Sequence, residues 1–220
     1  MKDLSITQEY MICTVNANGT LPNYNEKAVA CLIVSVLLEM QLAKCISLTD
    51  KKVSVCAELP EQMAYLQPLY NVINQGKPMK VEKVVETYMV TFTNKKLNEL
   101  VGALIESLKE ADIVEPVKVG FFGNKDGYVP KKDIVTGIIE KIRAELLEDG
   151  EISEDVIALT ALMDQAGSLK NYFSKYEQNE LKNKIEAIKQ SEAGTLAKEM
   201  AQHIETLNIA AIMPAILSNI

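Results

Sequence analysis

Apolar residues recur at helical spacing along most of the chain. In the clearest case, at 97–108, leucine, isoleucine and valine fall at i, i+3, i+4, i+7, i+8 and i+11, which places them on one face of a helix. Thr93 can cap this helix at its amino end, and the pattern stops near Asp112. We therefore predict an amphipathic helix between these two residues.

A second segment, at 25–44, is apolar almost all round. Its run of eleven residues from Ala28 to Leu38 is interrupted only by Ser35. A helix without a polar face is typical of a position surrounded by other helices, whereas a helix that crosses a bilayer needs about 18 or more apolar residues. The pattern therefore predicts a buried central helix and no membrane span.

Two further segments alternate between apolar and polar residues with a period of two, which is typical of strands. One pairs 46–48 with 53–55 around a short polar turn, and the other covers 113–129 with a turn of sequence NKDG at 124–127. We predict a β-hairpin in each segment.

The remaining periodic segments predict more helices. They are a short first helix capped by Thr7, a helix with Pro68 in its first turn, and four segments at 132–148, at 153–167, after Ser168 and at 195–218. Because long helices are combined with only short strands, the fold class is mainly α. We predict one domain over residues 1–220, a helical bundle around a central apolar helix, with β-hairpins.

The amino-acid composition predicts an aliphatic core and a reducing compartment. The chain has 220 residues, of which 48% are hydrophobic, with no tryptophan and four phenylalanines. Four cysteines stand singly in apolar stretches, at 13, 31, 45 and 56, which favours buried free thiols over a zinc or disulfide site. The N-terminal residues MKDLSITQEY contain no basic segment followed by an apolar run, so we expect no signal peptide and a cytoplasmic protein.

Charge and motifs exclude several classes of function. The net charge is −7 and the only arginine is Arg143, which argues against nucleic-acid binding but leaves room for a local basic patch. The single histidine, His203, lies outside any HExxH motif, and the glycines near the second hairpin form neither a dinucleotide-binding fingerprint nor a P-loop. We therefore predict a binding or assembly module, without metal or cofactor, rather than an enzyme.

Three motifs at helix ends carry a resemblance to a known family. They are LLEMQLAKCISL at 37–48, LKEADIVEP at 108–116 and IALTALMDQAGSLKNYF at 157–173. In their order and spacing these motifs resemble those of the Golgi phosphoprotein 3 family. The similarity extends from about Ile6 to Leu217. Eukaryotic members carry a disordered basic arm ahead of the domain, whereas the first predicted helix here begins almost at once, so we expect a prokaryotic-type, free-standing member.

The resemblance implies a peripheral membrane protein that binds phosphatidylinositol 4-phosphate. In eukaryotic members the headgroup pocket combines an aromatic residue with arginines. The aromatic position falls at Tyr24, and the arginine positions fall at Ile33, Asn98 and Val101, none of which is basic. Because a phosphate group needs cationic or amide donors, we expect weak binding of this lipid at most, or binding of another anionic headgroup.

Three lysines close in sequence to these positions are candidates to replace the arginines, namely Lys27, Lys95 and Lys96. Together with Tyr24 and Asn98 they form the predicted headgroup site. A lysine ammonium is a point charge without the planar fork of a guanidinium group, so such a site is expected to bind phosphate with less selectivity.

The hairpin at 115–129 is the second predicted contact surface. In the resembled family this segment is an apolar hairpin that contacts membranes and mediates self-association. The predicted contacts are Val117, Val119, Phe121 and Phe122, with both phenylalanines partly exposed in the monomer. Two functions therefore remain open at this point: a lipid-binding protein on a membrane surface, and a soluble oligomeric scaffold that binds no lipid.

Overall fold

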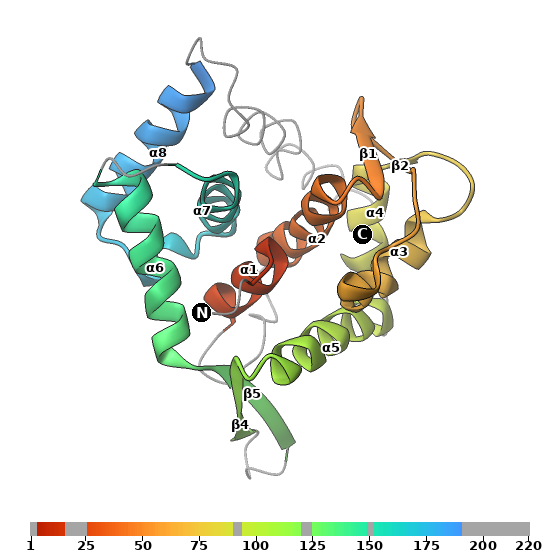
Figure 1. The fold of residues 1–220 in the computed structure, drawn as a ribbon, viewed down its shortest axis with the longest axis horizontal. Coiled ribbons are helices and arrows are strands. Elements are labelled where there is room, and N and C mark those ends of the chain that lie inside the picture. Colours follow the sequence, from red (N-terminus) through yellow and green to blue (C-terminus); the bar gives the residue numbers. More distant parts are fainter. Residues whose placement is uncertain (1–3, 16–25, 90–93, 120–124, 149–151, 191–220) are drawn as a thin grey trace.

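The computed structural model describes residues 4–15, 26–89, 94–119, 125–148 and 152–190. Its helices surround α2 (Glu26–Leu42), and a two-stranded hairpin, β4 (Val114–Val119) with β5 (Lys125–Pro130), stands out from them at one edge of the molecule (Figure 1). The predicted helix at 195–218 lies outside the described residues, as do Tyr24, Phe121 and Phe122.

Helix α2 is the centre of the bundle, as predicted. It packs against α1 (Ile6–Thr14), α4 (Val81–Met89) and α7 (Glu154–Ala166), which cover it on several sides. Leu32, Leu37 and Val36 are fully buried. The hydroxyl of Ser35, also buried, donates to the carbonyl of Leu32 at 2.7 Å, so this polar side chain is satisfied within its own helix.

Helix α1 begins with a capping box at Ser5, so the prediction that Thr7 caps it is wrong. The N–H of Gln8 donates to Ser5 Oγ at 3.3 Å, and the N–H of Ser5 donates to Gln8 Oε1 at 3.1 Å. These two bonds satisfy backbone donors that the helix itself leaves free. Thr7 lies two residues further on, within the first turn of α1, and is fully buried.

The first predicted hairpin is confirmed and extended by a third strand. Strands β1 (Ile46–Thr49) and β2 (Lys52–Val55) pair antiparallel, and β3 (Met79–Lys80) pairs with β2. Neither β3 nor helix α4, which follows it directly, was predicted from the sequence.

The predicted amphipathic helix is α5 (Lys95–Glu110). Its leucines at 100, 104 and 108 are buried, and its other apolar residues are partly buried against the core. Asn94 precedes the helix in a left-handed conformation, with φ of 49°, and makes no side-chain cap. Thr93, the predicted cap, lies outside the described residues. The 3-10 helix η1 (Glu61–Leu66) packs against α5, and α3 (Gln67–Ile73), with Pro68 in its first turn, follows η1.

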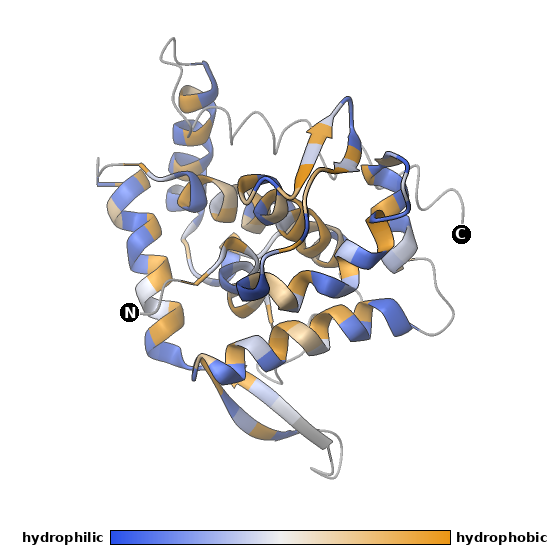
Figure 2. Cartoon of the chain, turned by 45° about the vertical axis from the view of Figure 1, so that its right-hand side comes forward, coloured by the Kyte–Doolittle hydropathy of each residue, from blue (hydrophilic) through white to orange (hydrophobic). Residues whose placement is uncertain are grey.

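The helices predicted at 132–148 and 153–167 are α6 (Lys132–Leu146) and α7. After Ser168 only a single 3-10 turn forms, η2 (Leu169–Asn171), and the next helix is α8 (Lys175–Gln190). The cap of α8 is Ser174, whose Oγ accepts from Glu177 N–H while its N–H donates to Glu177 Oε2. The outer helices α5 and α6 carry both hydrophilic and hydrophobic residues, as expected for helices with one buried face (Figure 2).

The second predicted hairpin is also present, but its turn was misplaced. Val114 pairs with Pro130 and Val119 pairs with Lys125, so strand β5 already includes Lys125, Asp126 and Gly127. The ladder continues past the NKDG signal because the backbone pairing of the two strands outweighs the local turn preference of an Asp-Gly pair.

The cysteines follow the prediction in three cases of four. Cys13, Cys31 and Cys45 are buried, whereas Cys56 is exposed, which corrects the expectation of a buried thiol. Cys56 directly follows the end of β2, at the margin of the small sheet, where no helix covers its side chain.

Candidate functional site

The predicted headgroup residues lie in the first turns of two helices. Lys27 is in the first turn of α2, and Lys95, Lys96 and Asn98 are in the first turn of α5, and all four side chains are exposed. Lys95 Nζ lies 3.9 Å from Glu99 Oε1, a solvent-exposed pair that constrains the ammonium only weakly. These side chains are accessible to a lipid surface, and Tyr24 lies outside the described residues.

The three positions that correspond to arginines in the resembled family differ in how deeply they are buried. Ile33 is fully buried in the middle of α2, while Val101 is half-buried on α5 and Asn98 is exposed. Of these three positions, only Asn98 can therefore carry a charged side chain without entering the core.

The β4–β5 hairpin is held firmly at its base. Lys131 N–H donates to the carbonyl of Ile113 at 3.0 Å, and Lys131 Nζ lies 2.8 Å from Asp112 Oδ1. Lys109 Nζ sits 4.8 Å from the centre of the Tyr128 ring, a cation–π contact between α5 and β5. Among the predicted contacts Val117 is half-buried, and Val119 is the last residue of β4.

A polar groove of about 690 Å³ lies between η1, the end of α5 and the start of α1. Nine residues line it: Gln8, Glu61, Gln62, Ala64, Tyr65, Ala103, Ser107, Glu110 and Ala111. Gln8 connects two of its walls, because its Nε2 donates to Ser107 Oγ at 3.1 Å. Ser107 Oγ donates in turn to the carbonyl of Leu104 at 2.8 Å.

A buried carboxylate lies behind this groove. Glu39, only 8% exposed although it stands in the apolar helix α2, accepts the N–H of Thr7 at 3.2 Å and the hydroxyl of Tyr65. The negative charge thus faces the amino end of α1, where backbone N–H groups have no partner within the helix. The pKa of Tyr65 is raised by burial and by the adjacent Glu39 carboxylate, so its hydroxyl remains a proton donor.

The chemistry of the groove does not suit a phosphate group. Its lining contains the exposed carboxylates Glu61 and Glu110, together with amides and hydroxyls, and none of its nine described residues is cationic. A phosphorylated headgroup would meet two negative charges there. This groove was not predicted from the sequence, although Glu39, the carboxylate that directly follows the apolar run of α2, was a signal that could have pointed to it.

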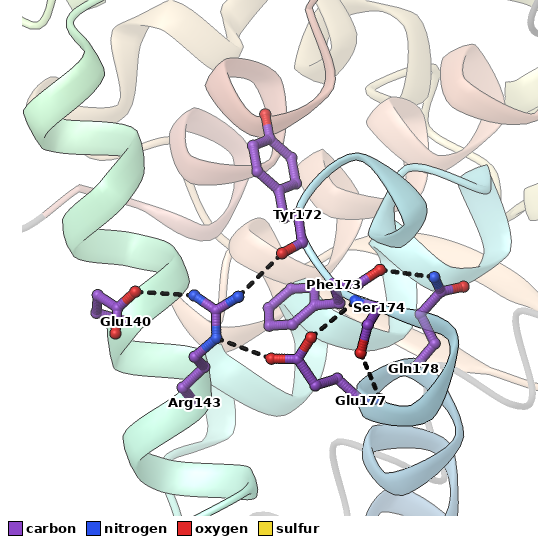
Figure 3. Close-up of polar contacts among 7 residues, drawn as sticks. All are labelled: Glu140, Arg143, Tyr172, Phe173, Ser174, Glu177 and Gln178. Carbon is purple, nitrogen blue, oxygen red and sulfur yellow. Dashed lines mark hydrogen bonds and ion pairs between the residues drawn. The ribbon is translucent and has the colours of Figure 1, made fainter.

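All three nitrogens of the Arg143 guanidinium group are hydrogen-bonded within the protein, so this side chain is not available to a ligand (Figure 3). Its Nη1 bonds Glu140 Oε1 at 2.8 Å, its Nε bonds Glu177 Oε1 at 3.1 Å, and its Nη2 bonds the carbonyl of Tyr172 at 3.0 Å. Its guanidinium carbon lies 5.0 Å from the centre of the buried Phe173 ring. The side chain therefore ties α6 to the start of α8.

The charges around Arg143 reinforce one another. Hydrogen bonds from Ser174 and from Arg143 lower the pKa of Glu177, and Glu177 in turn raises the pKa of Arg143. A guanidinium group can donate to three acceptors in different directions at once, which a lysine ammonium on a longer flexible stem cannot reproduce.

Replacement of Arg143 by methionine is therefore expected to lower the free energy of unfolding by about 1–2 kcal/mol, since two charge-assisted bonds and one carbonyl bond are lost. Arg143→Lys should recover less than half of this loss. Urea denaturation followed by circular dichroism measures both. As a control, Lys83→Ala removes only the exposed Lys83–Glu86 pair, at 3.0 Å, and should cost about 0.5 kcal/mol or less. Equal stability of Arg143→Met and the parent would contradict a structural role.

The described residues contain neither a membrane-spanning helix nor a metal site. Within this part of the chain no helix combines the length and hydrophobicity needed to cross a bilayer. The same residues contain no group of three or more histidine, cysteine or acidic side chains placed to hold a metal ion.

The chain matches a known protein family over most of its length. A family model described as Golgi phosphoprotein 3 (GPP34) matches residues 6–207. No curated protein matches.

Proposed function

The chain belongs to the Golgi phosphoprotein 3 (GPP34) family, and from this premise we propose that it is a peripheral membrane protein that binds an anionic lipid headgroup, such as that of phosphatidylinositol 4-phosphate. The proposed role is binding without catalysis. It rests on membership in a family known for this lipid and on two features of the surface.

The projecting β4–β5 hairpin is the observation that carries the proposal. It stands clear of the helical body, and its base is fixed by Lys131 and by the contact of Lys109 with Tyr128 (Figure 1). A hairpin that projects from the helical body in this way can contact a membrane while the helices remain outside it. The exposed Lys118 on β4 adds a positive charge close to that end.

Exposed lysines supply the second feature. With a net charge of −7, the molecule as a whole is repelled by an anionic membrane, so attraction must come from an oriented basic surface. We assign this role to Lys95 and Lys96 in the first turn of α5, with Lys27 as a further contact. Each lysine near an anionic surface contributes about 1 kcal/mol.

The binding is expected to depend on charge more than on the identity of the headgroup. Arg143 is engaged by Glu140 and Glu177, and the polar groove is lined by carboxylates. Selectivity for a monophosphate usually requires the forked donors of arginine. Since Arg143 is engaged, the exposed lysines, which act as point charges, are the cations that we assign to headgroup binding.

A flotation experiment with three vesicle compositions tests the proposal. Neutral vesicles should recover little protein, while vesicles with phosphatidylserine or with phosphatidylinositol 4-phosphate should recover it to similar extents. The double variant Lys95→Glu, Lys96→Glu should lower the partition coefficient on both anionic vesicles more than tenfold, since two attractive charges become repulsive. The matched control Lys77→Glu, Lys80→Glu makes the same change of charge at two other exposed lysines and should have a smaller effect.

The same experiment separates membrane binding from the scaffold function. A Phe121→Ser, Phe122→Ser variant should keep its helical circular dichroism and lose vesicle recovery, because the predicted hairpin contacts are removed. No recovery of the parent protein on any vesicle, combined with a larger species in light scattering that this variant abolishes, would overturn the proposal in favour of a soluble oligomeric scaffold.

A further inference from the structure

Cys45 and Cys56 lie directly opposite each other at the open end of the β1–β2 hairpin. In the register of the hairpin Ile46 pairs with Val55, so the next pair outward is Cys45 with Cys56. The carbonyl of Cys45 accepts the N–H of Cys56 at 2.8 Å and that of Ala57 at 3.2 Å, so the backbone of this pair is still bonded across the end of the hairpin. The two cysteines, ten residues apart in the chain, directly flank the segments 46–48 and 53–55 that the sequence predicts to pair.

The position of the pair suits a disulfide. Opposite residues of an antiparallel ladder project to the same face and have Cα atoms about 4.5–5.5 Å apart, within the range of about 4.4–6.8 Å that a disulfide spans. Each thiol now makes only a weak contact, Cys45 Sγ with the carbonyl of Ala43 and Cys56 Sγ with that of Ser54, both at 3.6 Å. Rotation of either side chain about χ1 therefore loses only one weak hydrogen bond.

The four cysteines differ in their access to solvent. Cys56 is exposed, while Cys45, at the end of the ladder, is 1% exposed. Cys13 and Cys31 are fully buried in α1 and α2, and burial raises the pKa of both thiols, as it does the pKa of Cys45. An oxidant in solution therefore meets one accessible thiol, which has one potential partner in reach.

We propose that Cys45 and Cys56 form a reversible intramolecular disulfide, with Cys56 as the residue that reacts first and Cys45 as the residue that resolves the intermediate. The co-reactant is a small disulfide of the glutathione type. This places a redox-sensitive modification site at the junction of the central helix and the small sheet, and it does not depend on the lipid-binding function.

The chemistry proceeds by two thiol–disulfide exchanges. The Cys56 thiolate attacks one sulfur of glutathione disulfide, its S–S bond breaks, and one glutathione thiolate leaves. The Cys45 thiolate then attacks the Cys56 sulfur of the mixed disulfide and expels the second glutathione thiolate. Two electrons pass from the protein dithiol to glutathione disulfide, and the two protons lost by the cysteines are taken up by the two glutathione thiolates.

The bond would tie the end of α2 to the segment that leads into η1. Cys45 N–H donates to the carbonyl of Met40 at 3.0 Å, so this residue is anchored to α2. On the other side, the Tyr70 hydroxyl donates to the carbonyl of Ala57 at 3.0 Å, which anchors the residue after Cys56 to α3. Oxidation therefore links two elements that are otherwise joined through the turn of the hairpin.

Treatment of the native protein with glutathione disulfide, followed by alkylation, tryptic digestion and mass spectrometry, tests the proposal. The expected product is one crosslinked species in which peptide 45–51 is joined to peptide 53–80, with two of the four thiols still free. Addition of dithiothreitol should restore all four thiols. The same treatment in a denaturant should give mixed pairings that include Cys13 and Cys31.

Two variants assign the roles. Cys45→Ala should stop at a mixed disulfide of glutathione with Cys56, whereas Cys56→Ser should remain unmodified under native conditions. As a control, Cys31→Ala should still form the crosslink. Stable glutathionylation of Cys56 in the parent protein, or a disulfide between two chains through Cys56 without the 45–56 crosslink, would overturn the proposal.

Discussion

Replacement of Leu37 by alanine is expected to lower the free energy of unfolding by about 2–5 kcal/mol. Leu37 is fully buried in α2, where α1, α4 and α7 pack around the helix. Truncation removes the transfer free energy of the side chain and leaves a cavity that the surrounding helices can fill only in part. Urea denaturation, monitored by circular dichroism with the slope of the transition compared between proteins, measures the loss.

Leu42 provides a matched control on the same helix. It is the last residue of α2 and is 45% exposed, so Leu42→Ala makes the same chemical change outside the core. We expect this variant to lose less than about 1 kcal/mol. If Leu37→Ala and Leu38→Ala each cost less than about 1 kcal/mol, α2 would not be the buried centre of the bundle.

The parts of the fold that could be predicted from the sequence are those with a long, regular pattern. Helix α2 was predicted because its apolar run is almost continuous, and α5 because its leucines repeat over about three turns. Helix α4 was missed, although Val81, Val84, Val85 and Tyr88 are all buried and have helical spacing. Its apolar face consists mainly of β-branched residues over only nine positions, and in so short a segment these residues favour strand as much as helix.

Features that depend on pairing between segments could be predicted only in part. Both hairpins were expected, but the register of β4 with β5, which brings Gly127 opposite Val117, decides where the turn lies. The third strand, β3, contains two residues, too few for a periodic signal.

The polar groove could not be predicted, because its residues come from distant parts of the chain. Gln8 and Ser107 are 99 positions apart and meet through one hydrogen bond, and Tyr65 reaches Glu39 from η1. Burial of the Glu39 carboxylate is tolerated because a backbone N–H and a hydroxyl both donate to it. Such a network is a property of the packed bundle, and it leaves only one trace in the sequence, a glutamate within an apolar helix.

The structure also decides where an added arginine can test the proposed headgroup binding. The resemblance relates Ile33 and Val101, together with Asn98, to arginine positions of the family. Since Ile33 is fully buried among the helices around α2, a guanidinium group there would have to leave water without a partner arranged to receive it. Asn98, by contrast, is exposed in the first turn of α5, beside Lys95 and Lys96.

Ile33→Arg is therefore expected to lower the free energy of unfolding by about 4 kcal/mol or more, and it can prevent folding altogether. Asn98→Arg adds the same charge and should change stability by no more than about 0.5 kcal/mol, since its side chain remains in solvent. Under the proposed lipid-binding function, Asn98→Arg should raise partitioning onto anionic vesicles about fivefold, the equivalent of about 1 kcal/mol for one added charge. Urea denaturation and flotation measure the two effects separately. A stable, folded Ile33→Arg protein would show that the middle of α2 is open to solvent, and an Asn98→Arg protein that folds normally without any gain on anionic vesicles would place the membrane contact away from α5.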